Sequence, residues 1–403
     1  MIFKKTRLYT NFNLLYFFLI LKSFFFKKKN FQNKIKDFLG TNNIALTSLG
    51  RTALYDIIKL IIEKTKKKTF LIAPYTIPAV LHAIKYAGGT IKFVDIDKKT
   101  GLINQDELEK NLDHDSAGVI ITHLYSSSQN IKNFIDRFNN KILIIEDAAI
   151  NFGAKIENKY LGTLGDFGFF SFNIVKNLNT LNGGAIFIKD NNLFEHYIKN
   201  TKKFFFPISL TLNLLLTVIF IKIFFNNFFY QIFHYFLQYV YKKKITFFLK
   251  RIYPILFHEY QNKLPSIYNY DFNWIMNDIG IYNLKKITKN IAERIEKAKL
   301  YDEYLDNSLV TKIQCFEGEN AMLEYSVILK KVTNKTIHKK LMQNGYDIRH
   351  TWYVNNAKDN SNLKEKKYVD SEYLERYVLC LPVHNNINVK DIKRISQLIN
   401  ALH

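Results

Sequence analysis

The regular alternation of two kinds of segment between residues 41 and 189 constrains the fold most strongly. Short runs rich in β-branched and aromatic side chains alternate with stretches whose apolar residues recur at helical spacing. Strands separated by helices form a mostly parallel sheet that helices cover on both faces. We therefore expect an α/β fold whose functional side chains gather at the carboxyl ends of strands. The expected strands are 69–72, 90–94, 118–122, 141–145 and 184–188, and the expected helices are 53–62, 78–86 and 130–138.

A hydrophobic segment at residues 202–244 interrupts this alternation. Residues 204–221 and 223–240 are apolar runs of bilayer length, and lysines flank the pair at 202–203 and 242–244. Both ends of the segment must rejoin one globular domain, so a single crossing of a membrane is excluded. Either the segment forms a hairpin into and out of the membrane, or its helices lie in the interface. Scattered Asn, Gln, His and Tyr among many Phe favour the in-plane or a shallow re-entrant form. A soluble use, such as covering a dimer partner, is the alternative.

These patterns divide the 403 residues into five expected segments. The apolar run at 11–26 is interrupted by Lys22 and lacks a small-residue cleavage site, which argues against a membrane span and a signal peptide. An interfacial helix and a packing arm remain as interpretations of this run. The segments are an apolar and basic N-terminal arm (1–40), a large domain that binds the cofactor (41–200), a hydrophobic membrane-associated insertion (201–260), a return to the large domain (261–290) and a smaller α+β C-terminal domain (291–403).

The formal net charge of +23 bears on the choice of partner. No DNA-binding motif gathers the basic residues, so we expect no nucleic-acid partner. The basic runs flank apolar segments instead, which predicts contact with the anionic inner face of the cell membrane. Cys315 and Cys380 are the only two cysteines and lie far apart, which excludes a four-thiolate zinc or iron–sulfur site and suits a reducing cytoplasm. No metal is expected.

The most informative stretch is residues 141–189, KILIIEDAAINFGAKIENKYLGTLGDFGFFSFNIVKNLNTLNGGAIFIK. In it a strand ending in E-D-A-A is followed by G-D, by S-F, by a lysine and by a strand that begins with G-G-A. This order resembles the DegT/DnrJ/EryC1/StrS family of sugar aminotransferases. The resemblance extends through most of 41–189, resumes in the C-terminal region and is absent from the hydrophobic segment.

The resemblance implies a pyridoxal-phosphate-dependent transferase of fold type I with pyridoxal 5'-phosphate as cofactor. It further implies transfer of an amino group from an amino acid, with glutamate as the expected donor, to a nucleotide-linked keto-sugar for surface polysaccharide synthesis. Family members are homodimers whose active sites lie at the subunit interface, so a homodimer is expected.

Two residues of the stretch match the family's central chemistry. Lys176 matches the lysine whose amine bonds the cofactor aldehyde and later carries a proton between cofactor and substrate. Its position after an apolar run and before a Gly-Gly turn suits a partly desolvated amine, whereas the alternative is an ordinary surface lysine. Asp147 matches the carboxylate that pairs with the pyridine nitrogen and keeps the ring an electron sink. Its alternative is a helix N-cap.

A second group of residues matches the family's phosphate site. Ser171, five residues before the lysine, matches the serine that bonds the cofactor phosphate. Gly50, Arg51 and Thr52 lie where the family carries a phosphate cup, next to the start of a helix whose free amides favour an anion. Asn273 resembles the family asparagine that reaches the cofactor phosphate of a neighbouring subunit.

Three further residues are weaker candidates for substrate contact. His123 aligns with a strand-end histidine near the family's active site, although a buried structural histidine fits as well. Tyr75 lies near the segment that stacks on the cofactor. Arg349 matches a family arginine that could meet a substrate acid, with a surface salt bridge as the alternative.

Departures from the family pattern keep other functions open. Ile77 stands where many members carry a stacking aromatic residue, and Ile150 replaces a glutamine that bonds the cofactor's 3-hydroxyl group. A sugar dehydratase of the same family is one alternative, but such relatives carry a histidine in place of Lys176 or need an iron–sulfur cluster. A membrane-tethered scaffold that keeps the fold without turnover is the other.

Overall fold

The computed structural model of this chain describes residues 5, 13–26, 30–126, 131–225, 229–230, 232, 236, 263–313, 320–348, 351, 353–359 and 368–401. Arg349 and most of the second apolar run fall outside these residues.

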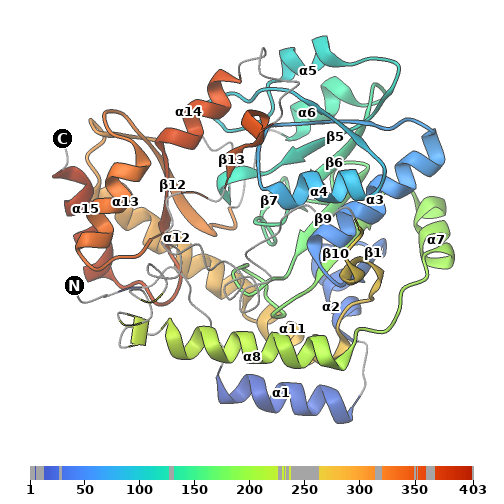
Figure 1. The fold of residues 1–403 in the computed structure, drawn as a ribbon, viewed down its shortest axis with the longest axis horizontal. Helices are drawn as coiled ribbons and strands as arrows, with labels where there is room; N and C mark the ends of the chain where they lie inside the picture. The colour runs from blue at the N-terminus through green and yellow to red at the C-terminus, as the bar shows by residue number, and fades with distance from the viewer. Residues whose placement is uncertain are drawn as a thin grey trace.

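A seven-stranded sheet in the order β1-β10-β9-β6-β5-β2-β4 forms the centre of the molecule (Figure 1). Neighbours from β9 to β4 are parallel, whereas β1 and β10 add antiparallel strands at one edge. The predicted α/β class and its mostly parallel sheet are therefore confirmed. The strands are β1 (Ile44–Thr47), β2 (Thr69–Ile72), β4 (Thr90–Phe93), β5 (Ser116–Thr122), β6 (Leu143–Asp147), β9 (Phe167–Ser171) and β10 (Gly184–Ile188).

Helices cover both faces of this sheet because alternate strand residues point to opposite sides. Phe70 and Ile72 pack into the core beneath α3 and α4, whereas Leu71 between them packs into the core with α5 and α6. The apolar runs of the parallel strands are continuous for this reason. The helices of this part of the chain are α2 (Asn30–Leu39), α3 (Gly50–Thr65), α4 (Pro78–Tyr86), α5 (Gln105–Asn111), α6 (Ile131–Phe138), α7 (Asn191–Asn200) and α11 (Asn277–Leu284).

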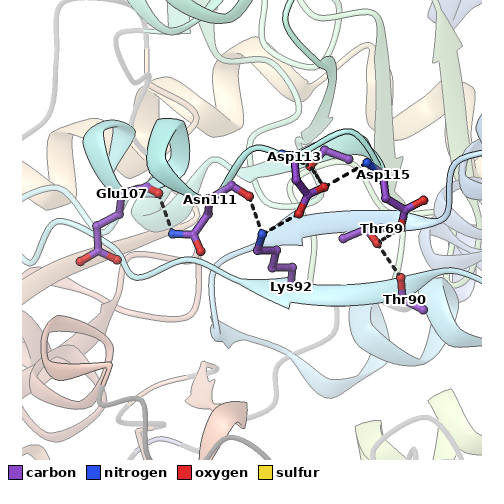
Figure 2. A network of polar contacts seen from close by, with 8 residues as sticks. Thr69, Thr90, Lys92, Glu107, Asn111, Asp113 and Asp115 are labelled. Carbon is purple, nitrogen blue, oxygen red and sulfur yellow. Dashed lines mark hydrogen bonds and ion pairs between the residues drawn. The ribbon is translucent and has the colours of Figure 1, made fainter.

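A polar network closes the amino ends of the parallel strands (Figure 2). Lys92 on β4 donates to the backbone oxygen of Asn111 at 2.6 Å and to Asp113 at 2.7 Å. The hydroxyl of Thr69 on β2 lies 3.0 Å from that of Thr90 on β4. Hydrogen bonds from Lys92 and Ser116 lower the pKa of Asp113 to about 2. This network stabilises the sheet at the end opposite to the carboxyl ends of the strands.

The C-terminal part of the chain builds a smaller α+β unit on an antiparallel sheet in the order β11-β12-β14. Its helices and strands share their own hydrophobic core, in which Val327, Leu329 and Ile395 are fully buried. The elements are α12 (Ile287–Tyr304), β11 (Val310–Lys312), β12 (Glu324–Leu329), α13 (Asn334–Gln343), α14 (Val369–Tyr377), β14 (Val378–Pro382) and α15 (Val389–Asn400). Short elements are β3 (Tyr75–Thr76), β7 (Lys155–Ile156), β8 (Lys159–Tyr160), β13 (Val354–Asn355) and the 3₁₀ turns Leu124–Ser126, Ser266–Asn269, Trp274–Met276 and Asn356–Asp359.

Two apolar helices, α1 (Leu14–Phe25) and α8 (Ile208–Phe224), lie side by side along one edge of the molecule, below α11 (Figure 1). The predicted bilayer-length run at 204–221 is shortened at its start, because Phe204 pairs with Tyr270 as an isolated bridge and α8 begins only after Pro207. The inner face of α8 packs on the protein through Leu214 and Val218. Among the helices that the structure describes, none combines the length and apolar character that a membrane crossing requires.

Candidate active site

A cavity of about 220 Å³ opens at the carboxyl ends of three adjacent strands. Thr122, Asp147 and Ser171 are the last residues of β5, β6 and β9, and all three line this cavity. Because the three strands are parallel, their ends meet at one edge of the sheet. The rest of the wall comes from the starts of α3 and α4, the turn after β6, the segment after β9, α8 and the C-terminal unit.

Lys176 and Asp147 face this cavity together. Burial lowers the pKa of Lys176, and the charges of Asp147 and Glu324 partly oppose that shift. Burial raises the pKa of Asp147, whereas the backbone N–H of Ala149 and the charge of Lys176 act in the opposite direction. Each group thus lies close enough to influence the protonation of the other. Burial thus disfavours the charged form of both groups.

Hydrogen bonds fix the segment that carries Lys176, both at its base and next to the lysine. Its base is closed by backbone bonds from Phe172 to Gly183 and from Thr180 to Phe172, each 2.9 Å long. Next to the lysine, Asn177 donates to the backbone oxygen of Ala321 at 2.7 Å. These bonds hold the lysine between the sheet and the C-terminal unit.

Asp147 ends β6 in a tight turn and not at a helix. Its carboxylate accepts the N–H of Ala149 at 3.0 Å, and turn residues follow the strand. The helix N-cap interpretation is therefore wrong. A carboxylate keeps further acceptor lone pairs after this bond, and Asp147 is part of the cavity lining.

The start of α3 faces the same cavity and is suited to an anion. Gly50 and Arg51 open the helix and line the cavity, and the N-cap Leu49 offers no side-chain hydrogen bond to the first amides. Amides at a helix start attract anions through their free N–H groups and the helix dipole. The strand end and the helix start meet closely, because a Cβ atom on Gly50 would lie 2.8 Å from Cβ of Ser171.

Two residues expected at the phosphate site lie elsewhere. The hydroxyl of Thr52 lies 2.9 Å from that of Ser48, and Thr52 does not line the cavity. The buried Asn273 accepts from the N–H of Ile275 and donates to Thr211 on α8 at 2.9 Å. Asn273 is thus turned toward its own chain and is absent from the lining of this cavity.

His123 belongs to a buried pair behind the cavity. Its Nε2 atom lies 2.8 Å from Glu146, whose carboxylate also accepts the N–H groups of Gly162, Leu164 and Gly165. Burial would raise the pKa of Glu146, but the bonds from His123 and these amides outweigh it and lower the pKa. Glu146 thus holds the turn before β9 in place. The Nε2 atom of His123 has its hydrogen-bond partner in Glu146.

Tyr75 is fully buried and does not line the cavity. Its hydroxyl lies 3.3 Å from that of Thr351, and its ring packs against Tyr353 with centroids 5.6 Å apart. Tyr353 is the residue of this pair that reaches the cavity wall. Arg349 lies outside the described residues.

Several lining residues were not anticipated from the sequence. Thr122 precedes the expected His123 by one residue, and its buried hydroxyl has no hydrogen-bond partner in the part of the chain that the structure describes. It is the register neighbour of Asp147 on the adjacent strand. Its position at the end of an expected strand could have predicted that Thr122 lines the site. Glu324 and Tyr353 come from the C-terminal unit, and no local pattern marks them.

Ile77 and Ile150, the two departures noted in the sequence, both line the cavity. Thr217 and Ile221 of α8 complete the wall. The apolar helix thus forms part of the site and is not a separate appendage. Among the described residues, no group of three or more His, Cys, Asp or Glu side chains could hold a metal ion.

Several curated proteins similar to this chain have nucleotide-linked sugars in their names. A GDP-4-keto-6-deoxy-D-mannose 3-dehydratase from Yersinia pseudotuberculosis is 24% identical over 92% of this chain and 90% of its own length. A UDP-4-amino-4,6-dideoxy-N-acetyl-beta-L-altrosamine transaminase from Campylobacter jejuni is 21% identical over 93% of this chain and 89% of its own length. A GDP-perosamine synthase from Escherichia coli O157:H7 is 28% identical, but the match spans 41% of this chain and 46% of the synthase.

Solved structures share the fold. The E. coli GDP-4-keto-6-deoxy-D-mannose-3-dehydratase with bound hydrated PLP superposes with a TM-score of 0.75 at 18% identity, over 99% of this chain and 100% of that chain. An aminotransferase from Helicobacter pylori involved in pseudoaminic acid biosynthesis gives a TM-score of 0.74 at 16% identity, over 99% and 98% of the two chains. Residues 24–203 and 254–400 match the sequence profile of one family, which confirms the resemblance seen in the sequence. The chain is a member of the DegT/DnrJ/EryC1/StrS aminotransferase family.

Proposed function

We propose that this protein transfers an amino group from an amino acid, with glutamate as donor, to a nucleotide-linked keto-sugar, with pyridoxal 5'-phosphate as cofactor. The observation that carries the proposal is the shared cavity of Lys176 and Asp147, which opens beside the start of α3. Nucleotide sugars appear in the names of the transaminase and dehydratase relatives, which match this chain over most of its length. Surface polysaccharide synthesis is the process that such a product would supply.

The residues present fit this cofactor. The absence of a Cβ atom at Gly50 brings helix amides next to Ser171, which makes a cradle for a phosphate. The buried hydroxyl of Thr122 has no hydrogen-bond partner among the described residues, so it is available to a polar group of the cofactor. An amine and a carboxyl group complete the donor set at Lys176 and Asp147.

The bound cofactor supplies an aldehyde that reacts with amines and a ring that accepts electrons. Asp147 would hold the cofactor ring by accepting a hydrogen bond from its protonated nitrogen, and its charge would keep that proton in place. Ser171 and the first amides of α3 bind the phosphate. Lys176 would provide the amine that holds the cofactor, and the same amine would carry the proton of the substrate carbon. Tyr353 and Ile221 exclude water from this reaction, because they wall the cavity with apolar surface.

Thr122 replaces, in this proposal, the polar contact that Ile150 cannot make. Its hydroxyl lies beside Asp147 on the adjacent strand, at the edge where the ring of the cofactor would lie. We assign it a hydrogen bond to the polar substituents of that ring. This contact would offset the loss of the glutamine that relatives carry at the position of Ile150.

Two further features belong to the proposal. The protein acts as a homodimer, and Asn273 of each subunit approaches the neighbouring site only if the bond to Thr211 is exchanged. The protein also contacts the inner face of the cell membrane through the apolar segment that contains α8. Support comes from the exposed apolar side chains of this helix and from the lysines beside it in the sequence.

Lys176→Ala tests the proposed reaction. The substitution should abolish the cofactor absorbance band near the imine region and lower aminotransfer by at least about a thousandfold. Product mass spectrometry on a panel of nucleotide keto-sugars with glutamate provides the measurement. Lys189→Ala, an exposed lysine that follows β10, is the matched control and should change neither quantity. Full turnover by Lys176→Ala would refute the assignment, and a folded wild type without turnover would favour the scaffold alternative.

Thr122→Val tests the cofactor contact separately. Valine keeps the shape and removes the hydroxyl, so pyridoxal phosphate should bind about two- to tenfold more weakly. Fluorescence titration of the cofactor-free protein measures the affinity. Thr90→Val on the far strand of the sheet is the control and should leave the affinity unchanged. Equal affinities for Thr122→Val and the wild type would remove this residue from the site.

A 3-dehydratase activity is the second candidate, because a dehydratase matches this chain over most of its length in sequence and in structure. Lys176 in the cavity argues for aminotransfer, since the lysine is the residue that dehydratase relatives are expected to lack. The two reactions give different products. An aminotransferase product gains nitrogen, whereas a dehydratase product loses an oxygen from the sugar, and the same mass spectra distinguish them.

A further inference from the structure

We infer that α1 and α8 together form a docking surface for an anionic phospholipid bilayer, with an acyl chain in the groove between the two helices. This inference deepens the proposed membrane contact, because it places the contact on two helices that are far apart in the sequence. The N-terminal arm and the apolar segment after β10 then act as one surface (Figure 1).

The α1–α8 surface consists of apolar side chains that face away from the protein. Phe18 of α1 is 57% exposed and Leu216 of α8 is 64% exposed. Exposed apolar side chains that gather on one surface mark interaction sites in soluble proteins. The exposed members of the surface are Leu14, Leu15, Phe17, Phe18, Leu21 and Phe25 on α1, and Ile208, Leu212, Leu216, Ile219 and Ile223 on α8.

The inner faces of both helices are fixed to the protein, so the outer side chains cannot turn inward. The hydroxyl of Tyr16 donates to Asn283 at 2.8 Å, and that of Ser23 donates to Asp278 at 2.8 Å. Val218 of α8 is fully buried. A helix anchored along one side presents its other side as a rigid face, which suits a position in the plane of an interface.

A groove of about 430 Å³ runs between the two helices. Its lining is apolar apart from Asn13 and Lys222, with Leu14 and Phe17 on one side and Ile223 on the other. An acyl chain fits such a lining, and Lys222 adds a basic side chain to it. The groove therefore offers a binding site for one lipid within the larger surface.

Charge identifies the lipid as anionic. Neither α1 nor α8 contains an acidic residue, and each carries a lysine in its last turn, Lys22 and Lys222. The side chain of Lys22 stays 61% exposed although it pairs with Asp278. Further lysines follow α1 in the sequence at 27–29, and the exposed Lys202 precedes α8, whereas its neighbour Lys203 pairs with Asp56 at 2.7 Å. Basic residues around an apolar face are attracted by anionic head groups.

The same charges disfavour a second copy of the chain as the occupant. In a two-fold symmetric dimer the same patch meets itself, so the lysines of one α1–α8 surface would meet those of the other. No acidic side chain in either helix could compensate this repulsion. An anionic bilayer meets both the apolar and the basic part of the surface.

Docking would bring the catalytic cavity next to the bilayer. Thr217 and Ile221 on the inner face of α8 line the cavity, whereas Leu216 and Ile219 on the same helix face outward. The cavity and the bound lipid would thus be separated by about one helix diameter, ~10 Å. The product would be released at the membrane surface, where a membrane-bound enzyme class that consumes amino sugars could take it up.

Vesicle flotation of the full-length protein tests this inference. The wild type should float with phosphatidylcholine vesicles that contain phosphatidylglycerol, and less with phosphatidylcholine alone. The double variant Phe17→Ser and Leu212→Ser, one change on each helix, should bind at least about tenfold more weakly. Lys222→Gln should weaken binding about fivefold on the anionic vesicles only. Ile198→Ser on α7, an equally exposed apolar residue, is the control and should bind like the wild type.

Equal flotation of the double variant and the wild type would overturn the inference, and so would a wild type that ignores anionic vesicles. A double variant that loses its dimeric state, in the absence of any vesicle binding, would assign the surface to a second copy. Aminotransfer in solution separates this outcome from the proposed function. Lys176→Ala should float like the wild type, and the double variant should keep its turnover of a soluble substrate.

Discussion

Burial gives single residues of the cavity their chemical character. Lys176 belongs to a chain with a large excess of basic residues, yet burial lowers its pKa. Asp147 shows the opposite shift for the same reason, since a charged carboxylate is also disfavoured away from water. Glu146, its neighbour in sequence, keeps a lowered pKa because three backbone amides and His123 satisfy its oxygens. Two adjacent carboxylates thus take different roles through their surroundings.

These shifts predict how cofactor binding depends on pH. The Lys176 amine must be neutral to react, and burial lowers its pKa from 10.5. Loading of pyridoxal phosphate should therefore rise with pH and reach its plateau at a pH lower than an ordinary lysine would require. The Asp147 carboxylate must be charged to pair with the ring nitrogen, and burial raises its pKa from 3.8. As the pH falls, binding should therefore be lost at a higher pH than an ordinary aspartate would give. Absorbance titration of the cofactor-free protein measures both limbs.

Asp147→Asn is the matched variant for the acid limb. The amide cannot titrate, so the loss of binding in acid should disappear while the rise at high pH remains. An unchanged acid limb would show that another group controls it.

Elements meet at the site because glycines allow backbones to approach. The start of α3 lies against the end of β9 and the start of β10, and a Cβ atom on Gly184 would lie 2.5 Å from the backbone nitrogen of Gly50. No rotamer change relieves such a contact, since the backbone fixes the position of a Cβ atom and the other atom belongs to the backbone. The position of the helix amides relative to Ser171 therefore depends on Gly184, which lies outside the cavity lining.

Gly184→Ala should displace the start of α3. We expect a loss of about 1–3 kcal/mol in the free energy of unfolding, from overpacking. We also expect about tenfold weaker binding of pyridoxal phosphate, because the amides move away from the phosphate position. Chemical denaturation and fluorescence titration provide the two measurements.

Gly118→Ala serves as the control for this substitution. A Cβ atom there would approach no atom closer than 3.3 Å, so small adjustments can accommodate it. Comparable effects of the two substitutions would contradict the role given to Gly184.

At the scale of the whole molecule, the cavity exists only where three parts of the chain meet. The sheet supplies Asp147, the C-terminal unit supplies Glu324 and Tyr353, and α8 supplies Ile221. The bond from Asn177 to Ala321 joins the lysine segment to the chain that leads into β12. Motion of the C-terminal unit would therefore act directly on the segment that carries Lys176.

Asn177→Ala should loosen this connection. The substitution leaves the backbone oxygen of Ala321 without its partner, which should cost about 1–3 kcal/mol in the free energy of unfolding. Because the lysine segment loses an anchor, kcat should fall more than KM changes. Asn191→Ala, which removes an exposed Asn–Asn bond, should stay within about 0.5 kcal/mol of the wild type. Equal effects of the two substitutions would show that Asn177 has no special part in the assembly.

Several features could be predicted from the sequence because they depend on local periodicity or on contiguous motifs. The strands β2 (Thr69–Ile72) and β10 (Gly184–Ile188) and the helix α4 (Pro78–Tyr86) begin and end where the pattern of side chains predicts. The strands β1 and β9 were not predicted. Strand β1 has only four residues, and β9 is an aromatic run with a glycine, so neither shows a clear periodicity. The strand-end position of Asp147 followed from the order of strands and motif.

Contacts between distant segments could not be predicted. Thr52 and Asn273 lie in the expected stretches, but their side chains bond Ser48 and Thr211 instead of lining the cavity. Side-chain direction at a helix start or a turn depends on neighbours from other parts of the chain. For the same reason no sequence pattern marked Glu324, which reaches the cavity from a separate sheet.

The sequence by itself determined the α/β class, the family and the pairing of an amine with a carboxylate in one motif, because these follow from periodicity and from residues close together along the chain. Only the tertiary structure decided that α8 walls the cavity and that α1 lies beside it as a second apolar helix. The physical reason is that an all-round apolar helix has no preferred face in the sequence. Which side is buried depends on the surfaces that the rest of the fold presents to it.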